Sequence, residues 1–478
     1  MIKGGIMLDR KDRSQHALFI PGSLEDYIPK NHILKQVDKV LDLSWLREEV
    51  ADCYDLTNGR PGIDPEVAVR LMLAGFFQGI IHDRKLMREA EVNIAIRWFA
   101  GYDLTDKLPH HSSLTRIRQR WGMERFLKIF QKTVEACGKA GLVSGETIHI
   151  DATLIRADVS WESLTTAHVK TVFQQNEDGK ENETNDGDKL KKKGRPRKPP
   201  KKPKKISKTD PDATMTTSKH SFHMEPSYKQ HTAVDDKAGI IVDVKLTTGE
   251  QNEGKELLDQ IARIRELNGK KPLHITADMS YAHGSNYGAL EKEEIDAVIP
   301  PNLKISKKKR FPSTRFKYDA RHDIVKCPGK QTLTKRSKRD NGWAYRCGSK
   351  ICQACKHKEK CLPDTGKCRT ILIVDGYEAL LRARRRKLKG WDKETFERYT
   401  RHKWRVEGAH GEAKTQHGLR RAARRGLWNV AIQMYLTATV MNLKRLAAFC
   451  SSFFKKNAPL FGYSGFREWI LAPIQEIS

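Results

Sequence analysis

The sequence lacks the segments that would carry a protein into or across a membrane. Its first residues, MIKGGIMLDRKDR, contain no apolar stretch of the kind that a secretion signal needs. No apolar run reaches the roughly 18 residues of a membrane span. The nearest, residues 429–449, is interrupted by Gln433, Asn442, Lys444 and Arg445, so we expect a buried amphipathic helix there. These absences predict a cytoplasmic protein without a membrane partner.

Acidic residues are also scarce relative to basic ones. The 478-residue chain has 59 Asp and Glu against 89 Lys and Arg, which gives a formal net charge of +30. An excess of this size attracts polyanions, and nucleic acid is the default candidate. The nine cysteines occur without an export signal, which favours free thiols or metal ligands over disulfides. The composition predicts a nucleoid-associated, nucleic-acid-binding protein of about two to four domains.

Residues 1–140 are expected to form a helical N-terminal domain. The segment GIDPEVAVRLMLAGFFQGI begins with Asp-Pro-Glu, which suits a helix N-terminus, and continues with apolar residues at helical spacing. A second helix is expected over residues 85–100, and a third with Ser112 or Ser113 as its cap. Arginines on the third helix permit a helix-turn-helix that binds DNA ends, but a helical bundle that mediates dimerisation explains the pattern equally well.

Beyond this domain the pattern changes to alternating strands. TIHIDATLIRAD predicts a strand, HTAVDDKAGIIVDVKLTTG a hairpin, and PLHITAD and DAVIPP two further strands. Helices are expected over residues 253–267, 392–422 and 430–449. Strands that lead into helices on one mixed sheet indicate an α/β domain. We place this core at residues 141–450, followed by a C-terminal tail at 451–478.

A first segment, residues 159–228, interrupts this core and is expected to be a disordered linker, acidic at its start and then basic. Its centre, KKKGRPRKPP, contains Gly194, Arg195, Pro196 and Arg197. Proline keeps the chain extended, and a narrow cationic strip fits the minor groove of A·T-rich DNA, where the negative potential is greatest. The tract resembles an AT-hook peptide and predicts a DNA contact, with a solvated Lys/Pro-rich linker as the alternative.

A second interruption, residues 303–390, is rich in cysteine. CGSKICQACKHKEKCLPDTGKC brings Cys347, Cys352, Cys355 and Cys361 close together in sequence. The Cys-x2-Cys spacing is typical of half a zinc site, and nearby lysines favour thiolates. The spacing of the other pair is irregular, so a structural Zn²⁺ and unmetallated thiols are both open.

Three acidic residues occupy positions that suit catalysis. Asp151 lies inside the strand HIDAT, where a carboxylate is costly unless it is paired or metal-bound. Asp278 ends the strand HITAD, and Glu407 lies on the helix RHKWRVEGAHGEAK. Three residues share a helix face with Glu407, namely Lys403, His410 and Lys414. About three carboxylates can supply the oxygens that divalent cations require. A strand hydrogen bond, a turn cap and an exposed ion pair would explain the same residues singly.

At these residues the sequence resembles bacterial insertion-sequence transposases of the DDE class. HIDAT, ITADMSY and VEGAHGEAKTQHGLRRAARRGL resemble the first-Asp, second-Asp and Glu-helix motifs of that family. Many relatives carry Tyr, two residues, Arg, three residues, Glu, six residues and Lys. Glu407 and Lys414 keep this spacing, whereas Lys403 replaces the arginine and Thr400 stands at the tyrosine position. The residues one step from that position are Tyr399 and Arg401.

The resemblance covers most of the chain. It implies a ribonuclease H-like mixed sheet with helices, preceded by an all-α N-terminal domain. It also implies a DNA transposase that binds the ends of an insertion sequence and catalyses metal-dependent cleavage and strand transfer, working as a homo-oligomer on DNA. Asp151, Asp278 and Glu407 would be its catalytic residues and would hold Mg²⁺ or Mn²⁺. Lys403 and Lys414 would contact DNA phosphates. Two alternatives stay open at this point: a ribonuclease H-like nuclease without strand transfer, and a non-catalytic DNA-binding derivative.

Overall fold

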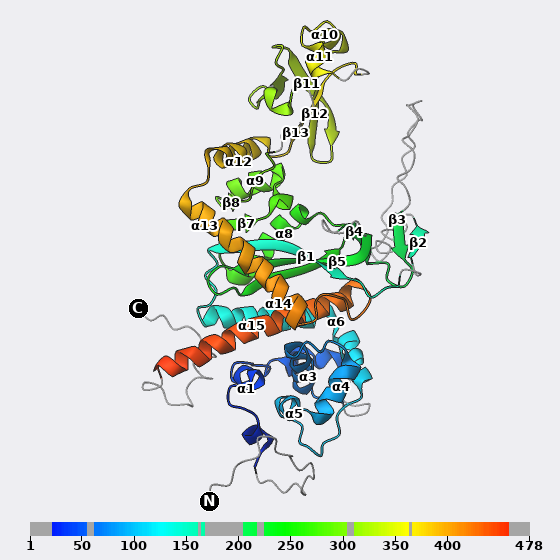
Figure 1. Ribbon diagram of the computed structural model, residues 1–478, viewed down its shortest axis with the longest axis vertical. Helices are drawn as coiled ribbons and strands as arrows, with labels where there is room; N and C mark the ends of the chain where they lie inside the picture. Colours follow the sequence, from blue (N-terminus) through cyan, green and yellow to red (C-terminus); the bar gives the residue numbers. More distant parts are fainter. Residues whose placement is uncertain are drawn as a thin grey trace, which may run out of the picture.

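The computed structural model describes residues 22–54, 62–160, 164–167, 204–217, 224–303, 310–362 and 366–457. Figure 1 shows the N-terminal helices at one end, a mixed sheet in the middle and a smaller sheet at the other end. One continuous hydrophobic core joins the helices to the mixed sheet, whereas the smaller sheet has a core of its own. The helices and the mixed sheet therefore pack as one body that carries an outlying β-subdomain.

The N-terminal part is helical, as predicted. Its elements are η1 (Leu24–Tyr27), α1 (Ile33–Asp38), α2 (Leu46–Glu49), η2 (Ala51–Cys53), α3 (Pro65–Phe77), α4 (Asp83–Val92), α5 (Ile94–Ala100) and α6 (His111–Lys139). The single helix expected over residues 85–100 is wrong, because Asn93 interrupts it and caps α5 with its side-chain oxygen. The cap expected for the third helix is also wrong. His110, rather than Ser112 or Ser113, accepts the capping hydrogen bond of α6.

The mixed sheet has the predicted ribonuclease H-like topology. Its strands are β1 (Thr147–Arg156), β4 (Thr214–Thr217), β5 (Met224–Asp235), β6 (Ile241–Thr248), β7 (His274–Ala277) and β8 (Asp296–Val298). Strands β6, β5 and β1 are antiparallel neighbours, and β7 and β8 continue the sheet parallel to β1. The connecting helices are η4 (Glu253–Lys255), α8 (Leu257–Asn268), η5 (Met279–Tyr281) and α9 (Gly284–Lys292). Three antiparallel strands followed by two parallel ones define this fold.

The end of the expected linker belongs to the sheet. Strand β4 and the start of β5 lie within residues 159–228, so the expected boundary at 228 is too late. A separate two-stranded ladder joins β2 (Leu164–Ala167) to β3 (Lys204–Ser207). The AT-hook-like residues Gly194, Arg195, Pro196 and Arg197 lie outside the described residues.

The cysteine-rich segment forms a five-stranded antiparallel sheet. Its elements are η6 (Ser313–Arg315), β9 (Lys317–Asp319), β10 (Ile324–Lys326), β11 (Thr332–Arg339), β12 (Gly342–Arg346), α10 (Ser349–Gln353), α11 (Lys358–Cys361) and β13 (Thr370–Val374). Seven buried hydrophobic residues form its core, namely Phe316, Val325, Leu333, Tyr345, Cys347, Ile371 and Ile373. The chain then returns through α12 (Tyr377–Lys389), which packs against α9.

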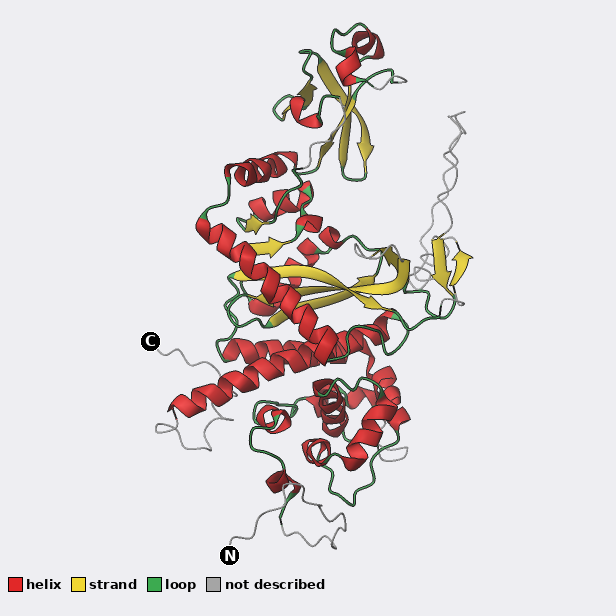
Figure 2. Ribbon diagram, in the orientation of Figure 1, coloured by secondary structure: helices red, strands yellow, loops and turns green. Residues whose placement is uncertain are grey.

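The helix that carries Glu407 crosses one face of the mixed sheet (Figure 2). It consists of α13 (Lys393–His402), the π-turn η7 (Lys403–Glu407) and α14 (Gly408–Gln416). The expected continuation to residue 422 is wrong. Gly418 follows with a positive φ of 70°, which breaks the regular helix, and a side chain at this position would clash with Ile81 of the N-terminal part.

The last helix, α15 (Leu427–Asn457), is buried for much of its length and packs against α6 and β6. The polar residues that interrupt its apolar run have partners. The Asn442 side chain accepts from the Ile241 N–H at 2.9 Å and donates to the Ile241 carbonyl at 2.8 Å. No helix in the described part of the chain is long and apolar enough to cross a membrane.

Candidate active site

The sheet register brings the two predicted aspartates side by side. Asp151 lies in the middle of β1, and Asp278 directly follows β7. Ile150 pairs with Ala277 in the parallel ladder between these strands, so one further step in register places Asp278 beside Asp151. Glu407 ends the π-turn, which packs against β1 and β5. The fold therefore gathers the three residues from positions far apart in the chain.

The three carboxylates lie within electrostatic range of one another. The pKa of Asp151 is raised to about 7, mainly by burial; a hydrogen bond from a backbone N–H lowers it, and the negative charges of Asp278, Glu253 and Glu407 contribute to the rise. Burial also raises the pKa of Tyr399, and the next contributions come from the same three predicted carboxylates. Tyr399 is therefore close enough to all three carboxylates for their charges to raise its pKa.

Glu253 is a fourth acidic residue of this cluster, and sequence reasoning missed its role. It lies in η4, just after the hairpin, and forms an ion pair of 3.1 Å with Lys229. Its proximity to Asp151 depends on how η4 folds back over the end of the sheet. No local sequence pattern carries that information.

The expected turn-cap role of Asp278 is also present. Its Oδ1 accepts from the Ser280 N–H at 2.7 Å, and its Oδ2 accepts from the Ser280 hydroxyl at 3.1 Å. These bonds order the carboxylate at the end of β7. A carboxylate oxygen has more than one lone pair, so capping leaves it able to bind a cation.

The residues predicted to share a helix face with Glu407 differ in burial. Glu407 and Lys403 are exposed, but His410 is buried against the sheet. Its Nε2 lies 3.0 Å from the Thr232 hydroxyl, and its Nδ1 lies 3.9 Å from Asp151. Burial lowers the pKa of His410 to about 3, so the ring is neutral.

Two predicted cations flank the site. Lys414 is half-buried, and burial followed by the charge of Arg420 lowers its pKa, while the nearby Asp151 raises it. Lys403 points to solvent. Arg401 is not a free cation, because it forms a paired contact with Asp236 at 2.8 and 3.0 Å.

The predicted cysteines share one cavity of about 30 Å³ in the β-subdomain. The thiols that line it are Cys327, Cys347, Cys352, Cys355 and Cys361. Backbone N–H groups donate to the sulfurs of Cys327 and Cys355, at 3.3 and 3.5 Å. Burial and the neighbouring Cys352 raise the pKa of Cys347 to about 11. Cys327, which lies near the four predicted cysteines in sequence, thus lines the same cavity.

The donors of the two clusters suit different metals. In the described residues, no group of three or more His, Cys, Asp or Glu side chains is close enough to hold an ion as it stands. The acidic cluster offers only oxygen. Burial and, to a smaller extent, the neighbouring carboxylates raise the pKa of Asp151, and a hard divalent cation would stabilise its charge. The thiol cluster offers the sulfur that zinc prefers.

A ribonuclease H-like sheet with three acidic residues gathered between two strands and a helix defines a class of enzymes that act on nucleic-acid phosphodiesters. Residues 186–443, more than half of the chain, match the family model of the transposase DDE domain, and residues 22–120 match a transposase domain model (DUF772). The chain belongs to the DDE transposase family. It is a DNA transposase, an enzyme that cleaves DNA and transfers its strands, and this family depends on divalent metal ions.

Family membership confirms the predicted class and function. Among solved structures, the chain resembles a piggyBac transposase described in a synaptic complex with hairpin DNA. The two are 10% identical, the match covers 93% of this chain and 86% of that one, and the TM-score is 0.29. No curated protein matches the sequence.

Proposed function

We propose that Asp151, Asp278 and Glu407 are the catalytic residues of this transposase and that they hold Mg²⁺, or Mn²⁺ in its place. The β1–β7 register, which sets Asp278 beside Asp151, carries the proposal. Glu407 supports it because it is close enough to affect the pKa of Asp151. When bound, the cations would activate the attacking oxygen and stabilise the leaving oxygen of a phosphodiester.

The two cations beside the cluster have separate tasks. Lys414 is half-buried next to Asp151 and would hold a DNA phosphate close to the scissile bond. Lys403 is exposed, about one helical turn before Glu407, and would bind a phosphate further along the DNA strand. Tyr399 lies among the carboxylates and would fill the space beside the bound strand.

The experiment replaces each carboxylate singly. Asp151→Ala, Asp278→Ala and Glu407→Ala should each abolish cleavage and joining of labelled element ends to a target plasmid in Mg²⁺, because the loss of one ligand uncouples the metal ions. Glu397→Ala, at an exposed glutamate of α13, is the matched control and should be fully active. Binding to element ends in metal-free buffer should persist in all four. Near-normal cleavage by any of the first three removes that residue from the assignment.

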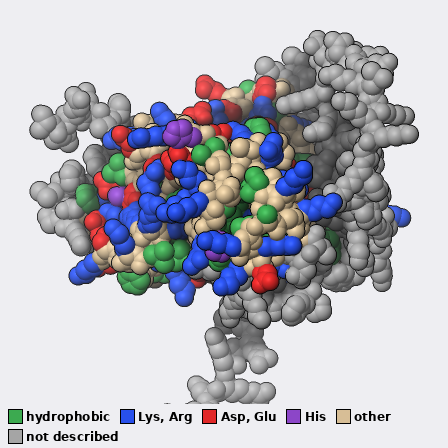
Figure 3. All heavy atoms as spheres, turned by 90° about the horizontal axis from the view of Figure 1, so that it is seen from above, with side chains coloured by type: hydrophobic (Ala, Val, Ile, Leu, Met, Phe, Trp, Pro, Cys, Tyr) green, Lys and Arg blue, Asp and Glu red, His purple; other side chains and the backbone are tan. Residues whose placement is uncertain are grey.

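We also propose how the rest of the chain meets DNA. The helical region 1–140 would bind element ends or join two copies, and the AT-hook-like residues Gly194 to Arg197 would enter A·T-rich minor grooves. The net charge of +30 supports this, as do the many Lys and Arg side chains on the face seen in Figure 3. The enzyme would then work as a homo-oligomer on DNA at the nucleoid.

A structural Zn²⁺ in the β-subdomain is the last part of the proposal. Seven buried side chains are a small core for a sheet of five strands, and small units of this kind commonly depend on a metal. Cys347, Cys352, Cys355 and Cys361, with Cys327 beside them, would supply the thiolates. Elemental analysis of protein never exposed to chelator should find about one zinc per chain. Absence of zinc would leave these residues as free thiols.

A further inference from the structure

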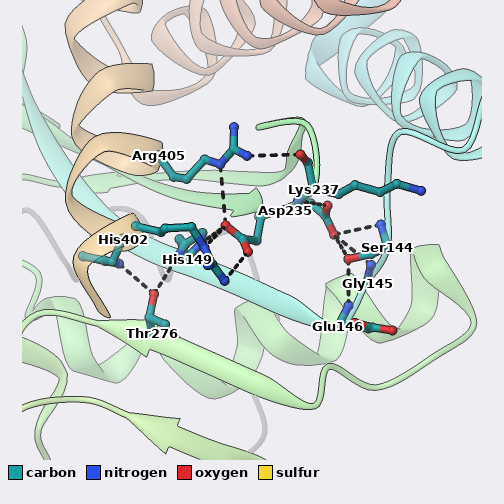
Figure 4. Close-up of polar contacts among 11 residues, drawn as sticks. Ser144, Gly145, Glu146, His149, Asp235, Lys237, Thr276, His402 and Arg405 are labelled. Carbon is teal, nitrogen blue, oxygen red and sulfur yellow. Dashed lines mark hydrogen bonds and ion pairs between the residues drawn. The ribbon is translucent and has the colours of Figure 1, made fainter. Parts of the chain in front are cut away.

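A line of buried hydrogen bonds joins the three elements that carry the carboxylates. Nδ1 of His149 lies 2.6 Å from the hydroxyl oxygen of Thr276, and that oxygen lies 2.9 Å from Nδ1 of His402. All three side chains are buried, and Figure 4 shows them meeting from β1, β7 and the end of α13. We call these residues the His–Thr–His chain.

Each member of the chain precedes one of the proposed catalytic residues. On β1 and β7 the members lie two positions before Asp151 and Asp278, and alternate residues of an extended chain share a face. The third member lies five positions before Glu407. In an α-helix of 3.6 residues per turn, five positions leave two residues about 140° apart. The π-turn Lys403–Glu407 holds one more residue and so brings Glu407 back toward the chain.

The direction of these hydrogen bonds follows from the Asp236 carboxylate, which can only accept. It lies 3.0 Å from Nε2 of His149, so that nitrogen donates. In its neutral form each of these two buried rings carries one proton. Nδ1 of His149 must then accept from the Thr276 hydroxyl, whose oxygen accepts from Nδ1–H of His402. The hydroxyl is needed as donor and acceptor at once.

Asp236 also binds the helix from the other side. Arg401 donates to it at 2.8 and 3.0 Å, and Arg405 lies 3.6 Å away while donating to the Lys237 carbonyl at 3.1 Å. Burial opposes the charge of Asp236, but hydrogen bonds from His149 and Arg401 lower its pKa overall. The hairpin turn, both strands and the helix are therefore tied into one closed ring of polar contacts.

We propose that the His–Thr–His chain sets the spacing of Asp151, Asp278 and Glu407 and thereby the affinity of the active site for divalent metal ions. This inference rests on the catalytic assignment made above. The members are positioning residues, which act through the elements that carry the ligands. Ligands from three separate elements keep their geometry only while those elements keep their spacing, and the groups behind metal ligands affect affinity for this reason.

Thr276→Val tests the chain, because valine has nearly the same shape but neither donates nor accepts a hydrogen bond. Thr276→Ser keeps the hydroxyl. The matched control is Thr437→Val, at a buried threonine of α15 whose hydroxyl donates to the Gln433 carbonyl at 2.9 Å, outside the chain. Mn²⁺ binding to the full-length protein without DNA is measured by electron paramagnetic resonance, together with the Mg²⁺ concentration that cleavage requires.

We expect Thr276→Val to weaken Mn²⁺ binding about 10- to 100-fold and to raise the required Mg²⁺ by a similar factor. Thr276→Ser and Thr437→Val should behave as wild type. Unchanged Mn²⁺ affinity in Thr276→Val, or equal weakening in Thr437→Val, overturns the proposal. If Thr276→Val does not fold, His402→Phe is compared with His402→Asn, since only asparagine keeps an N–H for Thr276. Equal Mn²⁺ affinities of these two variants would also overturn the proposal.

Asp151→Ala separates the two levels of the argument. If it leaves Mn²⁺ binding unchanged, the catalytic assignment fails and the positioning role fails with it. If it removes binding while Thr276→Val binds as wild type, the assignment stands and the role of the chain alone is refuted.

Discussion

Replacing Asp151 with Asn should stabilise the metal-free transposase at alkaline pH while it removes catalysis. The wild-type carboxylate is buried among like charges, which raises its pKa from 3.8 to about 7. A raised pKa means that the folded state binds the proton more tightly than the unfolded state does. Stability is therefore fully present below about pH 4 and is lost as the pH rises to about 7.

The size of the effect follows from the shift. A change from 3.8 to about 7 is about 3 pKa units, and at about 1.4 kcal/mol per unit the ionised carboxylate lowers the free energy of unfolding by up to about 4 kcal/mol. The side chain is 21% exposed, so water screens little of this repulsion. Asparagine cannot ionise, so the variant should not lose this part of its free energy of unfolding at pH 8.

The assay is denaturant unfolding of wild type and Asp151→Asn in EDTA at pH 5 and pH 8. The variant should gain about 4 kcal/mol at pH 8 and less than about 2 kcal/mol at pH 5. Asp259→Asn, at an exposed carboxylate of α8, is the control and should show no such difference. Added Mg²⁺ should stabilise wild type at pH 8 and the variant much less. An advantage of the variant that is equal at both pH values would refute the reasoning.

Two further predictions concern DNA binding and the junction between the N-terminal helices and the core. Deletion of residues 189–203, which ends before β3, should weaken DNA binding and flatten its salt dependence, since fewer phosphates are neutralised. If wild type and the deletion variant show equal salt dependence in a binding titration, the tract is only a linker. Asp83→Asn should lower the free energy of unfolding by about 3–5 kcal/mol, because Arg118 and Arg424 both pair with Asp83 and Arg118 is buried. Urea unfolding measures the free energy of unfolding of wild type and Asp83→Asn. A difference below about 1 kcal/mol between them contradicts the prediction.

Much of the fold could be predicted because its signals are local. The alternation in β1 and the turn between β5 and β6 appear directly in the sequence. Asp151 and Asp278 could be recognised because a carboxylate in or after an apolar strand is unusual. The helix break at Asn93 was harder to foresee, since the apolar pattern runs through it and only the cap shows where α5 begins.

The rest of the site depends on contacts that no local pattern carries. The π-turn has no sequence signal in a stretch with regular helical spacing, so the rotation of Glu407 relative to His402 could not be predicted. Glu253 comes close to Asp151 only because of the course that η4 takes in the fold. Cys327 joins the other thiols because β10 brings it back beside them.

The position of α15 has a consequence for the order of folding. This helix follows the whole catalytic core in the chain, yet it covers α6 and also contacts α1 and α3 of the N-terminal part. During synthesis the N-terminal helices therefore leave the ribosome long before the partner for their apolar face exists. Contacts between distant parts of a chain form slowly, and exposed apolar surfaces aggregate in the meantime. Newly made chains should need a chaperone until α15 emerges, and truncation before Leu427 should give an insoluble N-terminal part rather than a free-standing DNA-binding domain.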